Sequence, residues 1–142
     1  MQKSFVYERK INYYETDKMG VVHHSNYIRF MEESRIAFLE SNGMNYAEFE
    51  RQGVVSPVVA VECKFKTPCT YGDNINIRVE IVEYKGVRFV YEYEMTNKAT
   101  GDIVAIGKTE HCFTDETGRP IIIKKKFPEL HETFSKILEL EN

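Results

Sequence analysis

Hydrophobic and polar residues alternate along five stretches of the chain, and this period of two is typical of half-buried β-strands. The stretches are 5–13, 61–66, 75–81, 87–95 and about 103–114. The last four are separated by short glycine-containing turns at 71–74, 84–86 and 98–102. Because turns of this length join antiparallel neighbours, the pattern predicts an antiparallel sheet whose last four strands form a meander.

A helical period replaces the alternation over 26–42, where apolar residues recur three or four positions apart. Ser25 or Asn26 can cap the start of this helix, and Gly43 can end it. Shorter helices are predicted at 46–52, before Gly53, and at about 128–140.

The long helix and the strands match in length, at roughly 25 Å for 17 helical residues and roughly 33 Å for a ten-residue strand. Ile28, Ala37 and Leu39 widen the apolar arc of the helix beyond what a flat sheet would cover. The sequence therefore predicts an α+β fold in which a curved antiparallel sheet wraps one long central helix.

Each charged residue in and before this helix must either be paired or face solvent. Arg35 lies inside the apolar arc, and a buried charge must be paired, so Glu32, three residues earlier, is its expected partner. Glu15, Glu32 and Glu33 are otherwise expected to face solvent.

The composition, 42% hydrophobic and 29% charged over 142 residues, predicts a single folded domain spanning 1–142. A net charge of −3 provides no general attraction to nucleic acid or anionic membranes. The sequence contains no apolar run typical of a signal peptide or membrane helix, which predicts a cytoplasmic location. Cys63, Cys69 and Cys112 lack C-x-x-C spacing and are predicted to be reduced thiols.

Candidate chemistry concentrates between Tyr13 and Tyr27. Asp17 can serve as a general base or as a nucleophile. Free backbone N–H groups near His24 and the helix start can stabilise an oxyanion, and His24 can position water or assist proton transfer. Gly20 allows a substrate close to the backbone.

Other interpretations of these residues stay open from the pattern alone. Asp17 can be an ordinary turn residue, and His23 and His24 can be solvated imidazoles. A metal site is disfavoured, because adjacent side chains diverge and no H-x-x-x-H pattern occurs. No metal or cofactor is predicted.

The motif YETDKMGVVHHSNY at 14–27, followed by Phe30-Met31-Glu32 and Arg35, resembles the 4-hydroxybenzoyl-CoA thioesterase-like branch of the hot-dog fold. In particular, it is similar to the YbgC-type acyl-CoA thioesterases. Looser similarity extends through 68–73 and 115–120, so the resemblance covers nearly the whole chain.

The resemblance implies hydrolysis of an acyl-CoA or acyl carrier protein thioester. It implies that Asp17 is the catalytic carboxylate, that a backbone N–H near His24 polarises the carbonyl, and that His24 and Tyr13 lie at the site. His23 stands where the family more commonly has an aromatic residue, which affects the acyl pocket. The residues expected to contact substrate are Gly20, Val22, His23, Asn26, Tyr27, Phe30 and Met31.

The phosphates of coenzyme A require local cations, for which the candidates are Arg88, Lys64, Lys66 and the run 124–126. Hot-dog proteins pair sheets edge to edge, so a homodimer with its site at the subunit boundary, and further pairing to a homotetramer, is expected. Two alternatives remain: a non-catalytic acyl-thioester binding module, and a dehydratase of hydroxyacyl thioesters, which the order of Asp17 and His24 fits less well.

Overall fold

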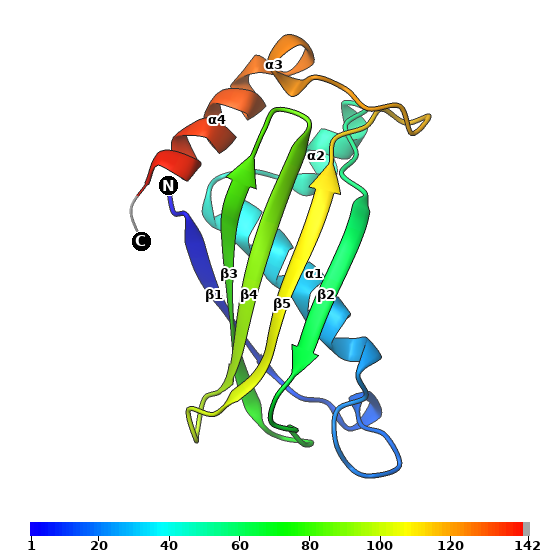
Figure 1. The fold of residues 1–142 in the computed structure, drawn as a ribbon, viewed down its shortest axis with the longest axis vertical. Coiled ribbons are helices and arrows are strands. Elements are labelled where there is room, and N and C mark those ends of the chain that lie inside the picture. Colours follow the sequence, from blue (N-terminus) through cyan, green and yellow to red (C-terminus); the bar gives the residue numbers. More distant parts are fainter. Residues whose placement is uncertain (141–142) are drawn as a thin grey trace.

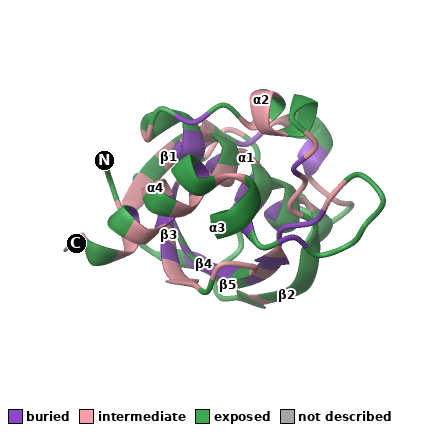
Figure 2. Cartoon of the chain, turned by 90° about the horizontal axis from the view of Figure 1, so that it is seen from above, coloured by how far each residue is buried: buried purple, intermediate pink, exposed green. Residues whose placement is uncertain are grey.

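A five-stranded antiparallel sheet curls around one long helix in the computed structural model, which describes residues 1–140 (Figures 1 and 2). The sheet has the order β1-β3-β4-β5-β2, and the central helix is α1 (Ser25–Ser41). This architecture confirms the predicted α+β fold. The strands are β1 (Ser4–Lys10), β2 (Val58–Phe65), β3 (Asn74–Tyr84), β4 (Arg88–Asn97) and β5 (Ile103–Cys112).

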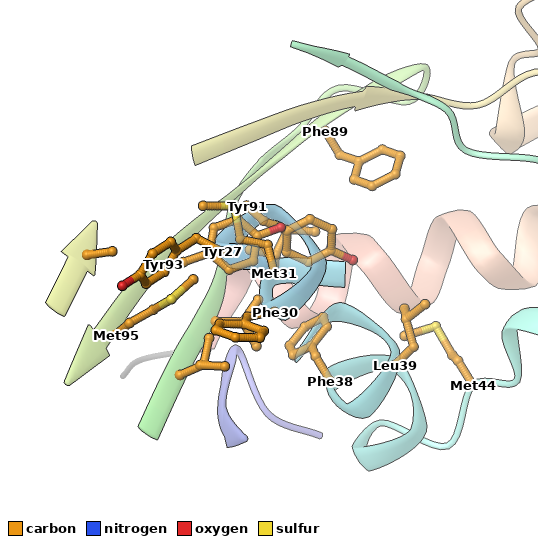
Figure 3. Packing of buried hydrophobic residues seen from close by; sticks show 14 of the residues in the cluster. Tyr27, Phe30, Met31, Phe38, Leu39, Met44, Phe89, Tyr91, Tyr93 and Met95 are labelled. Carbon is orange, nitrogen blue, oxygen red and sulfur yellow. The ribbon is translucent and has the colours of Figure 1, made fainter. Parts of the chain in front are cut away.

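The core lies between α1 and the concave face of the sheet, as Figure 3 shows in close view. Alternate residues of β3 point into it, and all four are fully buried: Ile75, Ile77, Val79 and Ile81. Fully burying one such side chain stabilises the fold by about 1.5–3 kcal/mol, so the period of two in the sequence corresponds directly to the core face of the sheet.

The predicted meander is wrong for one strand. β3, β4 and β5 are consecutive neighbours, but β2 pairs with β5 at the far edge and β1 pairs with β3. The turn at 71–74 therefore connects strands that are not adjacent. A period of two identifies a strand and its faces, whereas the choice of partner depends on contacts distant in sequence.

Several element boundaries differ from the prediction. β1 ends at Lys10 instead of residue 13, and a 3₁₀ turn, η1 (Tyr13–Glu15), follows. Gly43 ends α1 with φ +76°, as predicted. Ile28 is 47% exposed, so the buried arc of α1 is narrower than expected. The other helices are α2 (Tyr46–Arg51), α3 (Ile123–Lys126), which was not predicted, and α4 (Pro128–Glu139).

Gly107 on the inner face of β5 lets α1 approach the sheet closely. A Cβ built at Gly107 would overlap Met31 Cε, and Met31 is fully buried. We expect Gly107→Ala to lower the free energy of unfolding by about 1–3 kcal/mol, the typical effect of overpacking, as measured by urea denaturation. In a double-mutant cycle with Met31→Ala, the two losses should be less than additive, because the smaller side chain makes room for the new Cβ; an unchanged midpoint in the single variant would contradict this account.

Candidate active site

Asp17 sits on a tight turn immediately before α1. The Asp17 N–H donates to Val21 O at 2.8 Å, and the Gly20 N–H donates to Asp17 O at 2.9 Å. Gly20 has φ +81°, which a side chain would strain, so this glycine is required by the turn itself. Asp17 Oδ1 accepts the Met19 N–H at 2.8 Å. The carboxylate is thus held by the turn through one oxygen, and the second makes no hydrogen bond within residues 1–140.

The start of α1 carries both histidines of the motif. Their rings stack with centroids 4.2 Å apart, and both side chains are exposed. His23 Nδ1 accepts the Ser25 N–H at 3.2 Å and lies 2.8 Å from Ser25 Oγ. The predicted cap at Ser25 or Asn26 is wrong, because His24 occupies the N-cap position and provides no side-chain cap.

The backbone N–H of His24 makes no hydrogen bond within the part of the chain that the structure describes. It lies at the positive end of the α1 dipole, where an anion is favoured. The turn that carries Asp17 leads directly into the start of α1. Val22 lies between them, and its N–H donates to Cys69 O at 2.9 Å. A carboxylate and a free backbone donor are therefore held on the same rigid loop.

A buried ion-pair network fixes this loop, and the sequence interpretation missed it. Glu15 is 4% exposed, and its Oε1 accepts from Arg9 Nη1 at 2.6 Å and from the Asn12 N–H at 2.8 Å. Arg9 also donates to Glu33 at 2.9 Å. Glu15 and Glu33 were expected to face solvent; this expectation is wrong for Glu15, whereas the Glu33 side chain is 34% exposed and pairs with Arg9 at the surface end of the network.

The same network reaches the helix start through the Glu15 backbone. Glu15 O accepts the His23 N–H at 2.9 Å and the Asn26 side-chain amide at 2.8 Å. Arg9 lies on the inner face of β1, with its guanidinium carbon 4.3 Å from the centre of the Phe30 ring. Arg9 follows Phe5 and Tyr7 at a spacing of two, and this spacing was the sequence signal that the Arg9 side chain points inward.

Other predicted substrate contacts lie in the core. Val22 and Tyr27 are 4% exposed, and Phe30 and Met31 are fully buried (Figure 3). The Tyr27 hydroxyl lies 3.4 Å from Cys69 Sγ, and burial raises the pKa of Tyr27. In the structure these four side chains pack against their neighbours instead of lining an open pocket.

Tyr13 belongs to η1 and not to the end of a strand. Its ring is exposed and lies edge-on to Tyr71, with centroids 5.7 Å apart. The structure shows no hydrogen bond between the Tyr13 side chain and Asp17. The fold of the loop therefore does not link these two side chains directly. His24 instead lies edge-on to Phe65, at the end of β2, with centroids 6.3 Å apart.

The basic residues expected to hold coenzyme A are not brought together. Lys64 and Lys66 lie at the end of β2, next to the Asp17 loop, whereas Arg88 begins β4 at the opposite end of the sheet (Figure 1). The run 124–126 forms part of α3, also at that opposite end. Lys64 and Lys66 are therefore the candidates with the right position.

A cavity of about 290 Å³ lies between the second half of α1 and the sheet, bordered by α2 and α4. Arg35 lines it and donates to the Tyr93 hydroxyl at 3.1 Å, so the expected pairing of Arg35 with Glu32 is wrong. The hydrogen bonds continue from Tyr93 to Thr109 at 2.6 Å and from Thr109 to His111 at 2.8 Å. Burial, with a smaller effect of the Arg35 charge, lowers the pKa of His111 to about 4.

Three further observations concern metal ligands, membrane-spanning helices and cysteines. Among residues 1–140 there is no group of three or more side chains suited to hold a metal ion. No helix over the same range is long and apolar enough to cross a membrane. No disulfide joins the cysteines of residues 1–140; Cys69 is buried, whereas Cys63 and Cys112 are partly exposed.

Comparisons with known proteins agree on one family. The model of the Thioesterase-like superfamily matches residues 11–138. YneP of Bacillus subtilis (strain 168), a candidate acyl-CoA thioesterase, is 36% identical over 130 residues, covering 91% of this chain and 94% of that protein. The 1,4-dihydroxy-2-naphthoyl-CoA hydrolase of Thermosynechococcus vestitus is 29% identical over 106 residues, covering 74% and 72%.

A solved structure supports the same grouping. The DHNA-CoA thioesterase from Staphylococcus aureus superimposes with a TM-score of 0.91 at 33% identity, covering 94% of this chain and 90% of that one. Together with the helix wrapped by its curved sheet, these matches confirm the predicted hot-dog fold.

Proposed function

The chain belongs to the thioesterase-like superfamily and is a thioesterase; from this premise we propose that it hydrolyses aromatic or other compact acyl-CoA thioesters, with Asp17 as its catalytic carboxylate. The observation that carries this proposal is the rigid loop on which Asp17 and the free His24 N–H are both held. The 1,4-dihydroxy-2-naphthoyl-CoA hydrolases among the relatives favour coenzyme A as the carrier and an aromatic acyl group.

Two routes are open to Asp17, and both give the same products. As a general base, Asp17 takes a proton from water while the water oxygen adds to the carbonyl carbon. As a nucleophile, it attacks that carbon and forms an anhydride that water then opens. In each route the C–S bond breaks and the thiolate of coenzyme A leaves. Since a thiol has a pKa of roughly 8.5, the thiolate needs no strong acid to depart, and one carboxylate is enough.

The carbonyl oxygen becomes negative as the carbon is attacked. In this proposal it lies against the His24 N–H, at the positive end of α1, which stabilises the developing charge. The ring of His24, stacked on that of His23, is exposed beside this donor in the chain and can orient the water. The grouping of the chain with the YbgC-type branch is part of the same proposal and rests on the motif at 14–27.

The proposed enzyme is a homodimer formed through β2, with dimers pairing further into tetramers. β2 is hydrogen-bonded only to β5 and has a free edge. Its apolar side chains Val58, Val59, Val61 and Phe65 are each 46–54% exposed, an aggregation hazard for a lone subunit. A second copy pairing antiparallel on this edge covers them. The three free thiols fit a reducing compartment, which supports a cytoplasmic location.

The test is release of thiol from a panel of acyl-CoAs with short, long and aromatic acyl groups. We expect turnover of the aromatic and compact esters, with long chains slower because the cavity beside α1 has only about 290 Å³. A matched panel on acyl carrier protein should react more slowly. If the purified protein binds the esters in calorimetry but releases thiol from none of them, it is a binding module, and the proposal is wrong.

A further inference from the structure

Asn42 and Gly43 form the single Asn-Gly dipeptide of the sequence, at the point where α1 ends. An asparagine followed by glycine loses its side-chain nitrogen readily, because glycine has no side chain to keep its backbone nitrogen away from the preceding amide. Gly43 is exposed, and a Cβ built on it would meet no atom within 4 Å. The dipeptide is therefore open to solvent, and its protection must come from its hydrogen bonds and its backbone conformation.

The side chain of Asn42 joins the residues before β1 to the end of α1. Asn42 Oδ1 accepts the Gln2 N–H at 2.6 Å, and Asn42 Nδ2 donates to Gln2 O at 3.0 Å and to Phe38 O at 3.1 Å. The amide thus pairs with the backbone of Gln2 in both directions, and we call this pairing the Gln2–Asn42 contact. It requires a side chain that both donates and accepts, which an amide does and a carboxylate does not.

The folded conformation opposes loss of the side-chain nitrogen. For this reaction the Gly43 nitrogen must reach Cγ of Asn42. In the structure this nitrogen donates instead to Glu40 O at 3.0 Å, and the ψ angle of Asn42 is 13°, which turns the nitrogen away from the side chain. The end of α1 must therefore open, and Asn42 must leave Gln2, before the two atoms can meet. The free energy of this local opening sets how strongly the reaction is slowed.

We propose that Asn42 is a site of spontaneous deamidation, that the Gln2–Asn42 contact slows the reaction, and that the reaction in turn breaks this contact. The Gly43 nitrogen bonds to Cγ of Asn42 and gives up its proton, the Cγ–Nδ2 bond breaks, and ammonia leaves. Water then opens the resulting cyclic imide at either of its carbonyl carbons, which gives aspartate or isoaspartate. Water is the co-reactant, and nothing is oxidised or reduced.

The product does not fit the Gln2–Asn42 contact. The Gln2 N–H keeps an acceptor, but Gln2 O and Phe38 O lose their donor and face a carboxylate oxygen. The new charge also lies at the negative end of the α1 dipole, where an anion is unfavourable. Isoaspartate in addition adds a carbon to the backbone just before Gly43, whose φ of +76° ends the helix. Deamidation therefore loosens the N-terminal residues from α1, whatever reaction the protein catalyses.

The first experiment incubates the full-length protein in mildly alkaline buffer and follows the Asn42 peptide by mass spectrometry in the wild type, Gln2→Pro and the matched control Gln2→Ala. Proline removes the N–H that Asn42 accepts, whereas alanine keeps both backbone groups. Gln2→Pro should deamidate Asn42 about fivefold faster, the value of one hydrogen bond, and Gln2→Ala should stay within about twofold of the wild type. Asn97, followed by Lys98, is the internal reference and should convert more slowly. Equal rates in the two variants, or no conversion of Asn42 in Gln2→Pro, would overturn the proposal.

The second experiment tests the release of the N-terminal residues. Asn42→Asp reproduces the aspartate product, and hydrogen exchange of the Gln2 amide should be about fivefold faster in it than in the wild type, from the net loss of one hydrogen bond. The matched control is Asn45→Asp, which adds the same charge nearby. Asn45 Oδ1 accepts the Glu48 N–H at 3.2 Å as the N-cap of α2, a position that aspartate fills equally well, so exchange at Gln2 should not change. Unchanged exchange in Asn42→Asp would mean that β1 alone holds the N-terminal residues, and the proposed release would be wrong.

Discussion

Asp17→Asn is expected to lower kcat for thioester hydrolysis at least about a hundredfold, with a much smaller change in KM. The amide oxygen of asparagine can still accept the Met19 N–H, which Asp17 Oδ1 accepts at 2.8 Å, so the turn is retained. What is lost is the negative charge that takes a proton from water or attacks the carbonyl. Steady-state thiol release on the best ester of the panel measures the effect, and circular dichroism establishes that the variant is folded.

The matched control is Asp115→Asn, at a turn of the same kind. Asp115 Oδ1 accepts the Thr117 N–H at 2.8 Å and the Arg119 N–H at 3.1 Å, and Asp115 lies outside the proposed catalytic loop. Asp115→Asn should therefore leave kcat within about twofold, since it removes a similar turn charge without touching the reaction. If both variants lose activity to the same degree, Asp17 acts only through the turn, and another group must be the base or nucleophile.

The sequence predicted the sheet well because local alternation carries most of the information about strands. The residues at 75–81 alternate apolar and polar, and every apolar member is buried in β3. β2 shows where this information ends: its apolar residues Val59 and Val61 are about half exposed, because β2 is an edge. Which strand becomes an edge depends on pairing between segments that are distant in the sequence.

The loop of the site was predicted from its motif, whereas the groups that hold it were not. Asp17, Gly20 and His24 follow one another closely and are easily recognised together. Glu15 looked like an ordinary surface acid, because its partner Arg9 is supplied by β1 and only the folded chain brings them to 2.6 Å. Arg35 was assigned to the nearest acid along its helix, yet its partner is Tyr93, 58 positions away on β4.

The helix residues expected to line the acyl pocket illustrate the same limit. An apolar stripe predicts a buried face but not whether protein or ligand buries it. Phe30 and Met31 are covered by their own sheet, which approaches closely because β5 has Gly107 opposite Met31. Farther along the same helix, at Arg35 and Ile36, the facing layer is more open and the cavity appears.

Glu15→Ala is expected to cost about 3 kcal/mol of unfolding free energy, because it leaves one charge of a buried pair less compensated. The side chains of Arg9 and Glu15 are 12% and 5% exposed, so water replaces little of the lost interaction. The substitution also removes the acceptor of the Asn12 N–H, at the start of the 3₁₀ turn that leads to the proposed catalytic loop. Urea denaturation at fixed protein concentration measures the loss.

The control for this prediction is Glu132→Ala, which breaks the exposed pair with Lys136, four residues later on α4, and should cost no more than about 0.5 kcal/mol. Because Glu15 precedes Asp17 by two residues, the folded fraction of Glu15→Ala should also show a lower kcat for thioester hydrolysis. Double substitution with Arg9→Met removes the cation, whose one remaining ion-pair partner among residues 1–140 is Glu33, and should recover part of the stability without recovering activity, since the loop stays unclamped. Equal stability of Glu15→Ala and Glu132→Ala would mean that the pair contributes no more than a surface contact and that the loop is held by its backbone hydrogen bonds alone.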